Sequence, residues 1–219
     1  MDNVNISVLT PSRGRMGMLE QNFYKMYKMA RFPEKVESLV YIDEDDTESI
    51  NFYNKDFLKE YHPYVKIFVG PRVGFAYMHI MIKQLAALSK GDIILPVPDD
   101  CNFTVQNWED YLLPYIDKEL VLYHKFKLAI TRKAYEKFEC IKNFSGFSSF
   151  ELRHERRLKR PLDAALRKYA FHHGICARGY RIYGESIPRD KTAQEGRGEQ
   201  WSLQDTSILD NLPIRELTL

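Results

Sequence analysis

Two adjacent aspartates at the end of a buried strand are the clearest candidates for chemistry in this sequence. The run from Gly91 to Phe103 reads Gly-Asp-Ile-Ile-Leu-Pro-Val-Pro-Asp-Asp-Cys-Asn-Phe, so Asp99 and Asp100 directly follow an apolar stretch. A short apolar run bounded by Gly and Pro is typical of a strand that is covered on both faces. Adjacent carboxylates repel each other, and a shared divalent cation relieves the repulsion. The pair therefore predicts a metal–phosphate site, with an ordinary acidic turn as the alternative.

Polar residues also follow three earlier strands that we expect in the first half of the chain. They comprise Thr10, Ser12, Arg13 and Arg15 after the first strand, Asp43 and Asp45 after the second, and Arg72 and Gly74 after the third. Arginine and helix N-termini bind phosphate oxygens, and aspartate binds hard cations and ribose hydroxyls. Together these residues predict a site for a metal-bound nucleotide diphosphate. A solvated loop is the alternative for the acidic run 43–46.

Four strand–helix units must position these residues. The apolar patterns predict strands over residues 5–9, 39–42, 65–69 and 93–97, and helices over residues 16–30, 49–61 and 74–89. Alternation of this kind predicts an α/β fold, in which a mostly parallel, Rossmann-like sheet is flanked by helices. The carboxyl ends of parallel strands share one edge of the sheet, so the four polar strand ends are expected to meet there.

The second half of the chain is less regular and more basic. We expect a helix over residues 108–116, short antiparallel strands over 120–123 and 127–131, and helices over 161–174 and 201–211. Residues 143–150 and 184–200 are expected to be mobile loops. We expect one domain, residues 1–219, divided into two halves, 1–118 and 119–219.

Composition narrows the class of protein. The 219 residues have a net charge of +2, yet residues 120–189 hold 16 Lys and Arg against 6 Asp and Glu. This basic block suits a polyanion such as nucleic acid or an anionic lipid surface, and a solvated basic face is the alternative. Three scattered cysteines, with no signal-peptide pattern and no apolar run of membrane-spanning length, predict a cytoplasmic protein with reduced thiols.

The order of these motifs resembles the GT-A fold nucleotide-sugar glycosyltransferases, particularly the family-2-like group. The resemblance covers roughly residues 4–135 and rests on Thr10-Pro11-Ser12-Arg13, Asp43 or Asp45, Gly74, and the segment from Gly91 to Asp100. It implies donor binding by Thr10, Pro11, Ser12, Arg13, Arg15, Asp43, Asp45, Arg72, Gly74 and Asp99. It also implies Mn²⁺ or Mg²⁺ at Asp100, with Asp99 as a second ligand or a ribose contact. A strict Asp-x-Asp motif is absent at this position, because Asp99 and Asp100 are adjacent. The resemblance also implies that the half 1–118 binds the nucleotide-sugar and that the half 119–219 is the acceptor side.

The same resemblance implies a hexosyl- or pentosyltransferase that uses a nucleoside-diphosphate sugar, with a UDP-sugar favoured. Asp163 and Glu199 are the candidate catalytic bases, and a helix N-terminal role is the alternative for Asp163. Arg153, Arg156, Arg157 and Arg160 are the candidate acceptor-binding residues. The sharper hypothesis is transfer to a modified base in DNA, as in viral DNA-modifying enzymes. The other hypotheses are a nucleotidyltransferase and a nucleic-acid-binding module with a vestigial site.

Overall fold

A single mixed sheet is the centre of the structure, a computed structural model that describes residues 4–53, 64–72, 78–124, 127–137, 176–178 and 213–217. Within this part of the chain the strand order is β7-β5-β6-β4-β1-β2-β3-β8. The four central strands are parallel and comprise β1 (Ile6–Ser12), β2 (Val36–Asp43), β3 (Val65–Gly70) and β4 (Ile93–Pro96). The predicted α/β fold with a mostly parallel central sheet is therefore confirmed.

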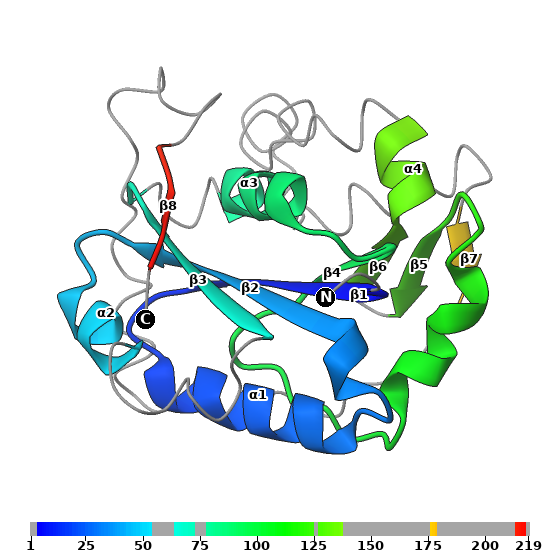
Figure 1. The fold of residues 1–219 in the computed structure, drawn as a ribbon, viewed down its shortest axis with the longest axis horizontal. Helices are drawn as coiled ribbons and strands as arrows, with labels where there is room; N and C mark the ends of the chain where they lie inside the picture. The colour runs from blue at the N-terminus through cyan, green and yellow to red at the C-terminus, as the bar shows by residue number, and fades with distance from the viewer. Residues whose placement is uncertain are drawn as a thin grey trace, which may run out of the picture.

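Helices cover both faces of this parallel core. Helix α1 (Met16–Met29) lies on one face, and α3 (Met78–Leu88) lies on the opposite face (Figure 1). Helix α2 (Thr47–Tyr53) follows β2. Because α3 returns the chain across β1 to β4, the connections run in opposite directions on the two sides of β1. The point between β1 and β4 is therefore the topological switch point, where open α/β sheets bind their ligands.

The face covered by α1 holds the main apolar core. Leu19, Phe23 and Met26 of α1 are completely buried, at 3- and 4-residue spacing. They pack with alternate strand residues such as Val8 and Val40, as the period of 2 in a strand requires. Trp108, which follows β4 in the chain, is also part of this core. Its indole N–H donates to the Met26 carbonyl at 3.0 Å.

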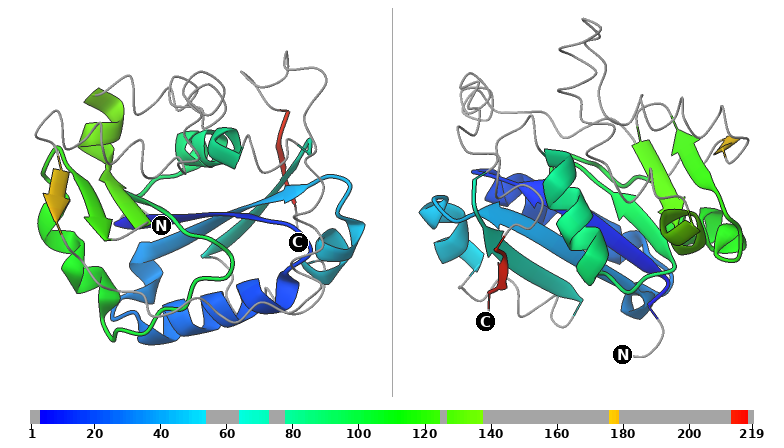
Figure 2. Two further views of the ribbon diagram at one scale, coloured as in Figure 1. Left: turned by 180° about the vertical axis from the view of Figure 1, so that it is seen from behind. Right: turned by 90° about the horizontal axis from the view of Figure 1, so that it is seen from above.

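Antiparallel strands extend the sheet at both edges. Strand β6 (Lys127–Thr131) pairs antiparallel with β4 and with β5 (Val121–His124), which confirms the expected antiparallel addition. Strand β7 (Cys176–Arg178) pairs parallel with β5, and helix α4 (Arg132–Lys137) follows β6. At the other edge β8 (Arg215–Glu216) pairs antiparallel with β3, so a C-terminal segment lies beside the nucleotide-binding half expected from the sequence (Figure 2).

Three local differences from the sequence prediction concern 3₁₀ turns and the end of β1. The helix expected over 108–116 is two 3₁₀ turns, η4 (Trp108–Tyr111) and η5 (Leu113–Tyr115), because Pro114 lacks an N–H donor and restricts the residue before it. A further 3₁₀ turn, η1 (Pro33–Lys35), precedes β2.

The third difference is that β1 continues through Ser12, where the sequence suggested a turn from Thr10. Its register with β2 extends to Ser12 opposite Ile42. Pairing with β4 stops at Leu9 opposite Pro96, so Pro11 interrupts no ladder on that side. Strand β1 therefore reaches beyond β4, and its last residues stand next to the turn that follows β4. None of the helices described is long and apolar enough to cross a membrane.

Candidate functional site

The carboxyl ends of β1, β2, β3 and β4 bring most of the predicted site residues to one edge of the sheet. The described members are Thr10, Pro11, Ser12, Arg13, Arg15, Asp43, Asp45, Arg72, Asp99 and Asp100. Hydrogen bonds and ion pairs connect most of them into two clusters, one around Asp99 and one around Asp43 and Asp45. The clusters meet at the end of β1 and the loop after it, because Ser12 and Arg15 contact one and Arg13 contacts the other.

A tight turn places the two adjacent aspartates. The Cys101 N–H donates to the Pro98 carbonyl at 3.1 Å, which closes a four-residue turn with Asp99 and Asp100 at its centre. Both aspartates are buried, with exposed fractions of 5% and 3%. The turn is thus real, as the alternative interpretation of the sequence supposed, but its carboxylates lie inside the protein. A buried carboxylate needs hydrogen-bond donors or a positive charge beside it. Ser12 and Arg15 supply both to Asp99.

Asp99 is held through both of its carboxylate oxygens. Arg15 Nη1 lies 2.8 Å from Oδ1, and Ser12 Oγ donates to Oδ2 at 3.1 Å. Burial raises the pKa of Asp99 above its ordinary value, while Arg15 and then Ser12 oppose this rise. Asp99 therefore has a fixed orientation before any ligand arrives.

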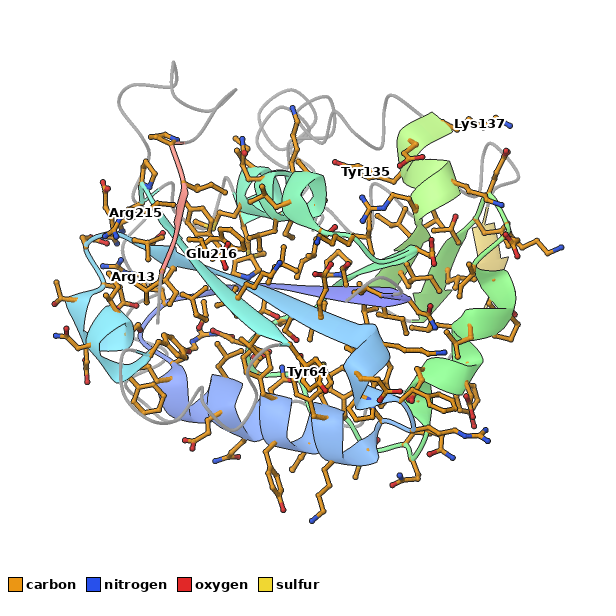
Figure 3. All side chains as sticks on the ribbon, in the orientation of Figure 1. Arg13, Tyr64, Tyr135, Lys137, Arg215 and Glu216 are labelled. Carbon is orange, nitrogen blue, oxygen red and sulfur yellow. The ribbon has the colours of Figure 1, made fainter. Side chains whose placement is uncertain are left out.

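Arg13 organises the second cluster. Its guanidinium donates to Asp43 Oδ2 at 3.0 Å and makes a two-pronged ion pair with Asp45, in which Nη2 lies 3.1 Å from Oδ2. Arg72 Nη1 approaches the same Asp45 oxygen at 3.5 Å. The hydrogen bonds that Arg13 donates to Asp45 lower the pKa of Asp45 and raise the pKa of Arg13. Two arginines and two aspartates thus form one network. Arg13, which joins both aspartates, lies at the opposite end of the view from Lys137 of α4 (Figure 3).

Asp43 differs from Asp45 because it is buried and only half satisfied. Its exposed fraction is 4%, and Oδ1 has no hydrogen-bond partner among the residues that the structure describes. Burial raises the pKa of Asp43 to about 6, against the opposing effect of Arg13. A buried acceptor without a partner costs about 1–3 kcal/mol. Asp43 is therefore the residue in this cluster best suited to accept a hydrogen bond from a ligand.

Asp46 is a neighbour that the sequence did not single out as functional. Its carboxylate accepts from the Ser49 N–H at 3.2 Å, from Ser49 Oγ at 2.6 Å and from the Gly14 N–H at 2.8 Å. It precedes Thr47, the first residue of α2, so it caps that helix and ties the loop after β1 to it. Gly14 has φ of 59°, a value that favours glycine. The signal for Asp46 was the Asp-Thr-Glu-Ser sequence, which is typical of a helix start.

The described residues can supply part of a cation site. They contain no cluster of three or more Asp, Glu, His or Cys side chains able to hold a metal by themselves. Asp99 and Asp100 provide hard carboxylate oxygens, and Mg²⁺ is typically bound by one or two carboxylates together with substrate phosphates. The pair therefore fits a cation that arrives with a phosphorylated ligand. Arg15 and Ser12 already engage Asp99. The assignment of the ion to Asp100, with Asp99 as a second ligand or a ribose contact, stays a prediction.

Several predicted residues lie outside the described part of the chain. They are Gly74, the candidate bases Asp163 and Glu199, and the candidate acceptor residues Arg153, Arg156, Arg157 and Arg160. Their roles stay predictions, as does the division of the domain into two halves.

Comparisons with known proteins bear on the fold. No protein-family model matches this sequence, and no curated protein matches it. A mannosyltransferase from Pyrobaculum calidifontis, solved in complex with GDP-Man and Mn²⁺, superposes with a TM-score of 0.57 at 12% identity. That match covers 86% of this chain and 59% of the mannosyltransferase.

Two further solved structures are similar. The glycosyltransferase GlyE of Streptococcus pneumoniae has a TM-score of 0.52 at 9% identity, over 81% of this chain and 45% of its own. The 4-diphosphocytidyl-2C-methyl-D-erythritol synthase of Anaerococcus prevotii has a TM-score of 0.53 at 12% identity, over 90% of this chain and 98% of its own. At such low identities the likeness concerns the fold alone. The chain has a GT-A-like fold, a Rossmann-type sheet whose buried acidic turn stands at the topological switch point.

Proposed function

We propose that this protein is a metal-dependent glycosyltransferase that binds a nucleoside-diphosphate sugar at the carboxyl edge of β1–β4. The observation that carries the proposal is the pairing of a buried Asp99-Asp100 turn with the half-satisfied carboxylate of Asp43, on strands that flank β1. One group suits the phosphate end of a nucleotide and the other suits its base. The solved complex of a structurally similar mannosyltransferase with GDP-Man and Mn²⁺ supports the same substrate class.

Asp43 is proposed to read the nucleobase. Its free Oδ1 accepts hydrogen bonds, so it favours a base that presents a ring N–H, such as uracil or guanine. Cytosine and adenine present a ring acceptor at the corresponding edge and can donate to Asp43 only through their exocyclic amino groups. A UDP-sugar remains the favoured donor, as the sequence suggested.

Arginines near Asp43 are proposed to bind the diphosphate. Arg13 and Arg72 are both paired with Asp45 at the rim of the site, where Asp45 is 46% exposed. An exposed ion pair contributes little to stability, so its arginines can exchange a carboxylate for a phosphate at low cost. Thr10, Pro11 and Ser12 line the β1 end between the two clusters.

The acidic turn is proposed to hold the ribose and the cation. Asp99, fixed by Arg15 and Ser12, would accept from ribose hydroxyls, and Asp100 would hold Mn²⁺ or Mg²⁺ together with the diphosphate. When bound, such an ion stabilises the negative charge on the departing nucleoside diphosphate. Asp99 and Asp100 are rigidly placed by the turn, so the site is organised before the donor binds.

The transfer itself breaks the bond between the anomeric carbon and the diphosphate oxygen and forms a bond from that carbon to the acceptor oxygen. The acceptor hydroxyl loses its proton to a base, for which Asp163 and Glu199 are the proposed candidates. The negative charge leaves on the nucleoside diphosphate. The transferred sugar is a hexose or a pentose.

The acceptor hypothesis rests on the basic block of the sequence. Arg153, Arg156, Arg157 and Arg160 suit a phosphate backbone, which makes DNA with a modified base the proposed acceptor. If so, salt-dependent DNA binding is lost in the Arg156→Ala/Arg157→Ala variant, and binding that ignores both salt and these arginines contradicts the hypothesis.

A nucleotidyltransferase is the second candidate function. It is favoured by the similarity to 4-diphosphocytidyl-2C-methyl-D-erythritol synthase, whose whole chain is nearly covered. Its substrate would be a nucleoside triphosphate, and it would release pyrophosphate. The first loop of such enzymes is usually rich in Gly and contains Lys, whereas Pro11-Ser12-Arg13-Gly14-Arg15 has one Gly and no Lys.

A thermal-shift panel tests the two candidates side by side. Ligands that bind the folded state raise Tm by mass action. We expect UDP-sugars or GDP-sugars with Mn²⁺ to raise Tm more than the nucleoside triphosphates, and Asp100→Asn to abolish the Mn²⁺-dependent part. A larger shift with CTP or UTP would favour the nucleotidyltransferase. The absence of a shift with every nucleotide would refute both.

A further inference from the structure

Asn22 is a buried asparagine in the middle of α1. Its exposed fraction is 1%, and its neighbours on the same face of the helix are the fully buried Leu19, Phe23 and Met26. Asparagine is a weak helix former and is seldom completely buried, because each of its polar atoms needs a partner. A leucine would complete this apolar face, so the amide needs an explanation outside the packing of α1.

The amide of Asn22 reaches the acidic turn. Its Nδ2 donates to the Pro98 carbonyl at 3.2 Å, and the same carbonyl accepts the Cys101 N–H that closes the turn. Pro98 is the residue directly before Asp99. The hydrogen bond from α1 thus fixes the first residue of the turn that carries both carboxylates.

A second contact from α1 fixes the other end of the turn. Lys25, three residues after Asn22 and therefore on the same side of the helix, donates through Nζ to Asn102 Oδ1 at 2.9 Å. Asn102 follows the turn residue Cys101. Helix α1 consequently contacts the segment 98–102 near both of its ends. Ser12 at the end of β1 and Arg15 in the loop after it hold Asp99.

Stability does not account for Asn22. Its Oδ1 is buried and has no hydrogen-bond partner within the described part of the chain, a deficit that costs about 1–3 kcal/mol. The one bond that Asn22 Nδ2 makes to Pro98 contributes about 1 kcal/mol, which does not exceed this cost. The contribution of the amide must therefore be sought in the geometry of the turn.

We propose that Asn22 is a positioning residue for the Asp99–Asp100 turn, an inference that rests on the proposed function. By fixing the Pro98 carbonyl, it sets how far the two carboxylates project toward the diphosphate and its cation. Side chains that orient the ligands of a metal in this way typically change metal affinity by about 10–100-fold when they are removed.

The variant Asn22→Leu tests the inference, and Tyr27→Phe is its matched control. Tyr27 lies on the same helix and in the same core, but its hydroxyl bonds Ser38 Oγ at 2.9 Å, away from the turn. Asn22→Leu removes the hydrogen bond to the Pro98 carbonyl, and Tyr27→Phe removes the hydrogen bond to Ser38 Oγ and a longer one to the Tyr64 carbonyl at 3.4 Å. The control therefore loses at least as much hydrogen bonding, and both variants should shift the urea midpoint by a small amount. Only Asn22→Leu should weaken Mn²⁺-dependent UDP binding in calorimetry, by about tenfold. Asn22→Ser, which is too short to reach Pro98, replaces it if the leucine variant does not fold.

Hydrogen exchange supplies a second measurement that needs no nucleotide. The peptide containing residues 98–102 should exchange faster in Asn22→Leu and at the wild-type rate in Tyr27→Phe, because the Cys101 N–H loses a fixed acceptor. Unchanged exchange in Asn22→Leu overturns the inference. UDP binding that is strong in the wild type and equal in Asn22→Leu also overturns it and leaves the proposed function standing. A wild-type protein that binds no nucleotide refutes the proposed function, and the inference with it.

Discussion

The ion pair between Arg15 and Asp99 is the most strongly buried one in the candidate site, and its removal has a large predicted effect. The side chains are 15% and 6% exposed, and Arg15 Nη1 lies 2.8 Å from Asp99 Oδ1. Arg15→Met keeps the aliphatic stem and leaves Asp99 as a buried carboxylate whose remaining donor among the described side chains is Ser12. Breaking a buried pair in this way costs about 3–5 kcal/mol. Because some water reaches Arg15 and Ser12 remains, we expect about 3 kcal/mol.

Urea unfolding at pH 7.5 measures this decrease in the free energy of unfolding. In thermal unfolding of a chain of this size, about 3 kcal/mol corresponds to a fall in Tm of roughly 6–12 °C. The double variant Arg15→Met/Asp99→Asn removes the uncompensated charge, so it should be more stable than Arg15→Met alone. The double-mutant cycle should give a coupling of about 2 kcal/mol, since residues in direct contact couple by up to about 3 kcal/mol.

Arg31 and Asp110 form the matched control for this cycle. Their separation is 3.6 Å, and their side chains are 58% and 41% exposed. A solvent-exposed pair of this kind contributes about 0–1 kcal/mol, so the cycle Arg31→Met/Asp110→Asn should show almost no coupling. Equal coupling in the two cycles, or none between Arg15 and Asp99, would refute the assignment of a buried, preorganised Asp99.

Two other predictions concern the β2–β3 side of the site. The pKa of Asp43 in the free protein is about 6, above its ordinary 3.8, so Asp43 takes up a proton as the pH falls through 6. UDP binding, measured by calorimetry, should therefore weaken below pH 6. The Asp43→Asn variant should bind UDP about tenfold more weakly at pH 7 and lose most of this pH dependence. If Asp43→Asn binds UDP with the same pH dependence as the wild type, Asp43 does not read the base. Gly70→Ala would place a methyl group 2.5 Å from Tyr41 Oη and 2.6 Å from Ile214 Cγ2, and should cost about 1–3 kcal/mol in urea unfolding. Gly17→Ala in α1 meets nothing within 4 Å and is its control, with an expected gain of about 0.5–1 kcal/mol.

The parallel core was predictable because its signals are local and strong. Each of the four strands is an apolar run that ends in polar residues, and the register that joins Ser12, Asp43 and Gly70 at one edge follows from parallel topology. The sequence predicted the ends of the strands less well than their existence. Strand β1 extends to Ser12 because β2 continues to pair with it, which is a tertiary effect that no local pattern in Thr10-Pro11-Ser12 reveals.

The candidate site was predictable as a set of residues and unpredictable as a network. Sequence order placed Arg13 and Asp43 at neighbouring strand ends, but their hydrogen bond depends on the relative twist and length of β1 and β2. The burial of Asp99 and Asp100 likewise depends on α1 and β1 around the turn. Asn22 was missed because an asparagine within an amphipathic helix has no sequence signal that points to a turn 76 residues away.

A crystal structure of the protein with UDP and Mn²⁺ tests the central claim most directly. We expect the nucleotide at the carboxyl edge of the sheet, with the uracil ring N–H on Asp43 Oδ1, the ribose at Asp99 and the Mn²⁺ between Asp100 and the diphosphate. Displacement of Arg13 or Arg72 from Asp45 toward the phosphates should accompany binding. A nucleotide bound elsewhere on the molecule, or a cation that contacts neither Asp99 nor Asp100, would contradict the proposed site.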